Sequence, residues 1–181
     1  SAKFDPGLYY SGILAKVTEY PNNVTIQVGP KEKKSSEADH WEAPHTATFS
    51  EGDKAEAGHT VKWDLPNSSQ EMIELHNTYR SIDNLMKTTL LQYQKETMNY
   101  STQRLSSEAH YSGGQSQLKD FFQDQLRNGQ VLLVTETKTR LLQNGTENTY
   151  IEVREKVDKG GNIMRTLSDI QKYKLTASFA S

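Results

Sequence analysis

The stretch from Trp63 to Gly129 decides the fold. It opens with Trp63-Asp64-Leu65-Pro66-Asn67-Ser68-Ser69-Gln70-Glu71-Met72, continues as a long amphipathic region and closes with Asp124-Gln125-Leu126-Arg127-Asn128-Gly129. Pro66 ends a strand-like run, and Ser68 with Glu71 has the spacing of a capping box. Gly129 stands where a left-handed helix C-cap is expected. The sequence therefore predicts consecutive helices with β-strands on either side.

The long predicted helix, residues 81–105, carries two apolar seams. The main seam is Ile82, Leu85, Met86, Leu90, Tyr93 and Tyr100. A second, weaker seam repeats every seven residues and consists of Leu91, Met98 and Leu105. A helix with two seams touches two surfaces. Either both surfaces lie inside one domain, or the second seam faces a neighbouring subunit, which makes these three residues the candidate oligomer interface.

Strand patterns precede the helices. Residues 13–20 and 24–28 alternate, and the second of these points Val24, Ile26 and Val28 inward. Residues 46–50 and 55–65, joined by Glu51-Gly52-Asp53, predict a hairpin with Val61, Trp63 and Leu65 on one face. The charged segment from Gly29 to Pro44 predicts a loop.

Strand patterns also follow the helices. Residues 131–142 and 150–157 flank Asn144-Gly145, a dipeptide typical of tight hairpin turns. Residues 172–179 predict a last strand. Together these patterns predict an α+β fold in which a mostly antiparallel β-sheet packs against two or three helices.

Composition limits the size and class of the protein. The 181 residues predict a single domain, 1–181. The apolar fraction is 34%, below the usual ~45–50% even with glycine added, so either one sheet face is solvated or a partner completes the surface. The formal charge of −2 argues against nucleic-acid binding, and the lack of cysteine excludes disulfides and zinc–thiolate sites. Because the chain starts without methionine, we expect an excised fragment whose flanks hold an anchor or an oligomerisation segment.

No residue pattern predicts catalysis or cofactor binding. The loop around His40 and His45 contains carboxylates that suit a divalent metal, but the two histidines are not at helical ligand spacing. Ser116 and Lys119 match the S-x-x-K spacing of a serine–lysine nucleophile, without the other elements of that chemistry. The sequence therefore predicts no catalytic, cofactor-binding or metal-binding residue, and a protein that is not an enzyme.

The order of elements resembles a known superfamily. The matching pieces are Pro6-Gly7-Leu8 near the start, the turn Glu51-Gly52-Asp53 before a long strand, the helical region from Leu75 to Tyr93, and the way the helices end between Ser101 and Leu126. This order is similar to the stomatin/prohibitin/flotillin (SPFH, or band 7) domain, best from Thr46 to Arg140. Two features depart from it: Gly129-Gln130-Val131 replaces the usual Gly-Ile pair, and the hairpin from Asn144 to Asp158 looks like an insertion.

The resemblance implies a non-enzymatic, membrane-associated scaffold domain. Such domains follow a membrane anchor, assemble into homo-oligomeric rings or cages, and in some cases regulate membrane proteases. The implied partners are further copies of the chain, a membrane protein or membrane protease, and a lipid surface near the N-terminus. Apolar and aromatic residues there are the membrane-proximal candidates, unless they form a buried first strand: Leu8, Tyr9, Tyr10, Ile13 and Leu14.

Two alternatives to the scaffold stay open. One is a soluble protein-binding module or virion structural component, whose contact surface is a sheet face or the hairpin from Asn144 to Asp158. The other is a hydrolase that uses Ser116 or the histidine-containing loop.

Overall fold

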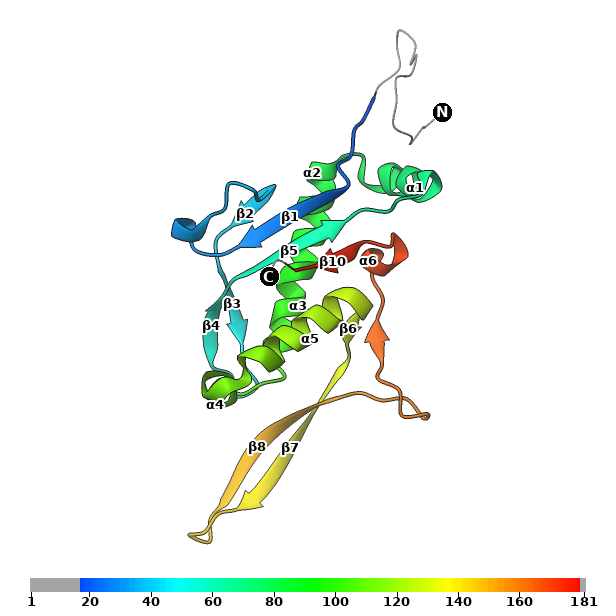
Figure 1. The fold of residues 1–181 in the computed structure, drawn as a ribbon. Helices are drawn as coiled ribbons and strands as arrows, with labels where there is room; N and C mark the ends of the chain where they lie inside the picture. The colour runs from blue at the N-terminus through cyan, green and yellow to red at the C-terminus, as the bar shows by residue number, and fades with distance from the viewer. Residues whose placement is uncertain (1–16, 180–181) are drawn as a thin grey trace. The chain divides into compact units, whose positions relative to one another are not determined.

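The computed structural model describes residues 17–179 and has an α+β fold with mostly antiparallel sheets, which confirms the predicted fold class (Figure 1). The chain forms two compact units, each assembled from separate segments. The first unit contains Ser1–Ala43, Gly58–Tyr93 and Asp169–Ser181, and the second contains Pro44–Ala57 and Gln94–Ser168.

The first unit is built on a four-stranded sheet with the order β10-β5-β1-β2. Its strands are β1 (Asn23–Val28), β2 (His40–Glu42), β5 (His59–Asp64) and β10 (Thr176–Ser178). β5 runs antiparallel to β1 and β10, whereas β2 runs parallel to β1. Ile26 lies opposite Val61 at the centre, and neither side chain is exposed to solvent.

The inward residues of both central strands were predicted correctly. Val24, Ile26 and Val28 alternate with partly exposed neighbours in β1. In and just after β5, Val61, Trp63 and Leu65 are buried as well. The period of two identified this core because only one face of each strand packs against other elements.

The predicted hairpin between residues 46–50 and 55–65 was wrong in part. β3 (His45–Thr48) pairs only with β4 (Lys54–Ala57), while β5 pairs with β1. Gly58 separates β4 from β5, and a Cβ atom added there would lie 3.1 Å from the Val28 carbonyl oxygen. A glycine at this position lets the chain pass close to the β1 backbone, so the apparent single strand from Ala55 to Leu65 is two strands.

Two further predictions need correction. The predicted loop from Gly29 to Pro44 contains a 3-10 turn, Lys31–Lys33, and the strand β2. Two hydrogen bonds that the local sequence does not predict hold β2 in place. Trp41 Nε1 donates to the Gly29 carbonyl at 3.1 Å, and the Thr25 N–H donates to Asp39 at 2.7 Å. Within the predicted strand 13–20, residues 17–20 are described and lie outside any strand.

The helices of the first unit begin at the predicted cap. They are α1 (Ser69–Tyr79), α2 (Ile82–Leu85), a π-helical turn (Met86–Leu90), the start of α3 (Leu91–Thr102) and α6 (Asp169–Lys172). The Ser68 hydroxyl accepts a hydrogen bond from the Glu71 N–H at 3.2 Å. The Tyr79 hydroxyl donates to Asp169 at 2.8 Å and ties α1 to α6.

The second unit combines helices with short two-stranded sheets. Its helices are the rest of α3, α4 (Ser107–Ala109) and α5 (Gln115–Asn128), and its strands besides β3 and β4 are β6 (Gln130–Val131), β7 (Leu133–Leu141), β8 (Glu147–Glu155) and β9 (Arg165–Thr166). α5 ends at Gly129, as predicted. Its φ of 106° is positive, but its ψ of 151° lies outside the left-handed helical region, so the predicted left-handed C-cap is wrong in its conformation. β7 and β8 form the predicted hairpin around Asn144-Gly145.

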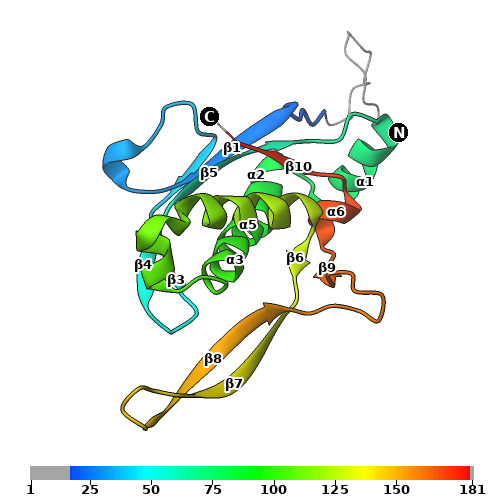
Figure 2. The ribbon, with the colours of Figure 1, turned by 60° about the horizontal axis from the view of Figure 1, so that its bottom comes forward.

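A buried polar cluster joins α3, α5 and β6 within the second unit (Figure 2). Gln125 is fully buried; its Nε2 donates to Ser101 Oγ at 2.9 Å, and its Oε1 accepts from the Val131 N–H at 3.0 Å. Gln130 Nε2 donates to Thr97 Oγ1 at 3.1 Å. These bonds satisfy groups that would be costly to bury alone, and they fix α5 and β6 against α3.

Candidate interaction surface on the β7–β8 hairpin

The β7–β8 hairpin is a long two-stranded ribbon within the second unit. Its pairing runs without interruption from Leu133 opposite Glu155 to Leu141 opposite Glu147. In Figures 1 and 2 the hairpin extends away from α4 and α5. Across residues 17–179, no third strand pairs with it, so the outer edges of both β7 and β8 are open.

The turn sequence sets the register of the hairpin. Asn144 Oδ1 accepts from the Thr146 N–H at 3.1 Å, and Gly145 has a φ of 83°. The Leu142 N–H then donates to the Thr146 carbonyl at 2.8 Å and starts the ladder. The Gly145 N–H donates to the Leu142 carbonyl at 3.0 Å, so the predicted reversal at Asn144-Gly145 is a three-residue loop in which Gly145 supplies the positive φ.

One side of the hairpin, here called the threonine face, is uncharged over most of its length. The alternation of side chains places on it Leu133, Thr135, Thr137, Thr139, Leu141, Thr149, Ile151 and Val153, with Glu155 and Glu147 at its two ends. Toward the turn it is open to solvent: Leu141 is 73% exposed and Ile151 is 59% exposed. β-branched and apolar residues suit a packed sheet face, so this exposed face has the composition of one that receives a partner.

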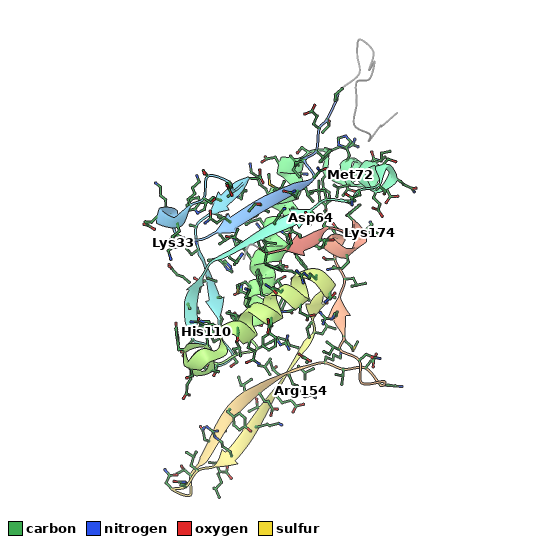
Figure 3. The ribbon with its side chains drawn as sticks, in the orientation of Figure 1. Lys33, Asp64, Met72, His110, Arg154 and Lys174 are labelled. Carbon is green, nitrogen blue, oxygen red and sulfur yellow. The ribbon has the colours of Figure 1, made fainter. Side chains whose placement is uncertain are left out.

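The opposite side, here called the charged face, carries Glu136, Lys138, Arg140, Tyr150, Glu152 and Arg154, together with Val134 and Asn148. Glu136 and Glu152 are directly opposite each other, but each reaches a cation diagonally. Arg154 Nη2 lies 2.7 Å from Glu136 Oε1, and Lys138 Nζ lies 2.5 Å from Glu152 Oε2. Figure 3 shows Arg154 on this ribbon.

The hydrogen bonds of the charged face shift its pKa values. The hydrogen bond from Arg154 holds the pKa of the Glu136 carboxyl below its usual range. The hydrogen bond to Glu152 raises the pKa of Lys138. Both residues therefore stay charged around neutral pH, and the strand β7 presents a fixed negative charge two residues before a fixed positive one.

The base of the hairpin is anchored to α5 and to the segment after α3. Arg104 forms an ion pair with Glu155, and its guanidinium carbon lies 3.6 Å from the centre of the Phe121 ring. Burial lowers the pKa of Arg104. An open hollow of about 410 Å³ lies here and is lined in part by Leu133 and Val153. These contacts hold the base of the ribbon while its turn end stays free.

A second hollow, of about 800 Å³, lies in the first unit at the start of α1. Figure 3 marks Asp64 and Lys174 among the residues that line it. Three of its polar side chains already have partners: Lys174 lies 2.6 Å from Glu71, and Ser68 caps α1. The hairpin, with two open edges, is the stronger candidate for binding.

The other predicted residues do not gather into a site. The membrane-proximal candidates Leu8, Tyr9, Tyr10, Ile13 and Leu14 lie outside the described residues. The interface candidates Leu91, Met98 and Leu105 are 3%, 7% and 6% exposed. This burial leaves them little surface for a neighbouring subunit and favours the alternative in which both seams pack within one chain.

The chemistry considered from the sequence has no geometry to support it. No three histidine, aspartate or glutamate side chains among residues 17–179 come close enough to hold a metal ion. Ser116 and Lys119 are both exposed on α5, whereas an activated lysine has to be buried to lower its pKa.

Sequence reasoning identified the hairpin but missed its two distinct faces. The threonines at 135, 137 and 139 alternate with charged residues, and that alternation was the available signal. The division into faces required the register of β7 against β8, which shows which side chains lie together.

Comparison with known proteins identified no relative of this chain. No family model matches the sequence, and no curated protein or solved structure matches the chain. Within residues 17–179, no helix is both long and apolar enough to cross a bilayer.

Proposed function

We propose that this chain is a non-enzymatic, membrane-associated scaffold domain that assembles with copies of itself into a ring or cage organising membrane proteins. The observation that carries the self-assembly is the β7–β8 hairpin, a two-stranded ribbon with open edges and an exposed threonine face. The membrane association rests on the resemblance to the SPFH domain.

The physical argument for a partner starts from the stability of an isolated ribbon. A hairpin of two strands is marginal in water without further packing. This one has strands of nine residues each, and only its base contacts α5 and the segment after α3. Open strand edges of this length are templates for pairing with another chain. An assembly that covers these edges stabilises the ribbon.

The argument for the membrane starts from the order of elements. The SPFH-like order comprises early strands, a hairpin ending at Leu65-Pro66, consecutive helices and a strand after Gly129. The strand before Pro66 is β5, which pairs with β1 instead of β3. The strands, the helices and the stop at Gly129 have counterparts here in β1 to β5, α1 to α5 and β6. In this proposal the described units lie at the membrane surface.

Sizing the parent protein in detergent, after fractionation of cells, tests the proposal. We expect it in the membrane fraction and at a mass of several copies. A variant that replaces residues 139–149 with Asn-Gly joins Lys138 to Tyr150, a hydrogen-bonded pair of the ladder, through a two-residue turn and removes most of the ribbon in register. We expect that variant to assemble less. A strict monomer without membrane association would refute the scaffold.

The same hairpin also suits a second candidate function. In a soluble protein-binding module or virion structural component, the open edges would pair with a different protein by strand addition. The sequence upstream of Ser1 in the parent protein separates the two: an apolar anchor supports the scaffold, and a polar or globular segment supports the binding module.

A further inference from the structure

The sequence of β7 is nearly symmetric about its central residue. It reads Leu133-Val134-Thr135-Glu136-Thr137-Lys138-Thr139-Arg140-Leu141. Reversal about Thr137 exchanges threonine with threonine, leucine with leucine, and the negative Glu136 with the positive Lys138. An antiparallel copy of the same strand is therefore complementary to it over most of its length; the exception is Val134, which meets Arg140.

The backbone of β7 is oriented for such a pairing. The Leu142 N–H donates to the Thr146 carbonyl, and the Lys156 N–H donates to the Leu132 carbonyl. Backbone groups alternate along an antiparallel pair, so the even-numbered residues bond to β8. The odd-numbered residues of β7, Thr137 among them, direct their N–H and C=O groups to the open edge.

We infer that β7 pairs antiparallel with β7 of a second copy, with Thr137 opposite Thr137 of that copy. The inference rests on the proposed self-assembly and names its contact. Glu136 then faces Lys138 of the second copy, and the reciprocal pair forms by symmetry. Thr135 faces Thr139, and Leu133 faces Leu141. The product is a four-stranded sheet, β8-β7-β7-β8, whose threonine faces lie on the same side.

Charge favours this register over its neighbours. Side chains of a sheet alternate between faces, so the nearest alternatives shift the centre of symmetry by one residue. A centre at Glu136 puts two carboxylates opposite each other and gives Glu136 no cation. A centre at Lys138 pairs Glu136 with Arg140 but puts two ammonium groups opposite each other. The centre at Thr137 is the one of these three that pairs Glu136 with a cation and places no like charges directly opposite.

The other edge of the hairpin lacks this complementarity. Full overlap of β8 with its own copy is centred at Ile151. That arrangement places Glu147 opposite Glu155 and gives Glu152 no cation, because its opposite residue is Tyr150. The β7 edge is therefore the self-pairing edge.

A pair of proline variants tests the edge. Thr137→Pro removes an N–H at the β7 edge, and Thr149→Pro removes one at the β8 edge; neither loses a bond between β7 and β8. In sedimentation equilibrium of the 181-residue chain, we expect the wild type and Thr149→Pro to dimerise and Thr137→Pro to stay monomeric. A monomeric wild type, a dimeric Thr137→Pro, or equal loss in both variants overturns the pairing.

Charge exchange tests the register. The variant K138E/E152K keeps an opposite-charge pair inside the hairpin but puts Glu136 opposite a carboxylate of the second copy. We expect a dimer dissociation constant roughly 10- to 100-fold higher than that of the wild type. The variant E136K/K138E/E152K/R154E reverses all four charges and restores every pair, so its dissociation constant should return to within about threefold. Failure of that recovery overturns the register.

The same variants in the parent protein separate this inference from the scaffold. If Thr137→Pro leaves the membrane assembly at its full size, the β7 contact is refuted and the scaffold proposal stands. Conversely, if the protein is absent from membranes and forms only dimers that Thr137→Pro dissociates, that result supports the β7 contact and refutes the scaffold. Because a two-fold contact closes on itself, a ring or cage needs a second contact elsewhere on the chain.

Discussion

Gln125 offers the sharpest test of what holds the second unit together. Its side chain is fully buried and bonds both to Ser101 Oγ at 2.9 Å and to the Val131 N–H at 3.0 Å. Removal of the side chain by Gln125→Ala leaves the buried Val131 N–H without its acceptor. Ser101 keeps a partner, because its Oγ also donates to the Thr97 carbonyl at 2.7 Å.

The expected loss has two parts. A buried N–H left without an acceptor costs about 1–3 kcal/mol. Truncation of the buried side chain adds about 1 kcal/mol for lost apolar contact and the cavity that remains. We therefore expect Gln125→Ala to lower the free energy of unfolding by about 3 kcal/mol, which is roughly 100-fold in the unfolding equilibrium. Gln125→Leu fills the volume and isolates the first part, about 1–3 kcal/mol.

Urea unfolding of each variant measures the loss, and amide hydrogen exchange at Val131 locates it. Gln117→Ala is the matched control, because Gln117 lies on the same helix and is exposed; we expect a change within about 0.5 kcal/mol. The reasoning is refuted if Gln125→Leu is as stable as the control, or if the Val131 amide exchanges at the wild-type rate in both variants.

Three further predictions concern particular groups. Burial, together with the hydrogen bond to Asp169, raises the pKa of Tyr79 to about 12. The protonated Tyr79 hydroxyl should therefore stabilise the fold below pH 10, and this stability should be lost as the pH rises toward 12. In thermal melts, Tyr79→Phe should abolish that part of the fall in stability at alkaline pH. The hydrogen bond from Lys174 holds the pKa of Glu71 below its usual range, so Lys174→Met should raise that pKa in an NMR titration, and an unchanged value would contradict the ion pair. Gly129→Ala should destabilise the chain by about 1–3 kcal/mol in urea unfolding, because a Cβ there combines a φ of 106° with a 3.0 Å approach to the Thr166 carbonyl; Gly29→Ala, in open space, is the control that should change little.

The local features of the fold were accessible from the sequence because each depends on a few neighbouring residues. The period of two predicted which residues of β1 point inward, the Ser68–Glu71 spacing predicted the start of α1, and Asn144-Gly145 predicted the β7–β8 hairpin. Each of these acts over a few residues through backbone geometry or one hydrogen bond. The sequence of β7 likewise already contains its symmetry about Thr137.

Tertiary structure decided the features that depend on distant partners. β5 pairs with β1 rather than completing a hairpin with β3, and β2 forms from a segment whose charge predicted a loop. The polar cluster at Gln125 needs three elements brought together before its burial becomes favourable. The same holds for the candidate surface: the symmetry of β7 is written in the sequence, but only its pairing with β8 determines which backbone edge stays open. Hydrogen bonds between distant segments have no signature in local sequence, because either partner alone could bond equally well to water.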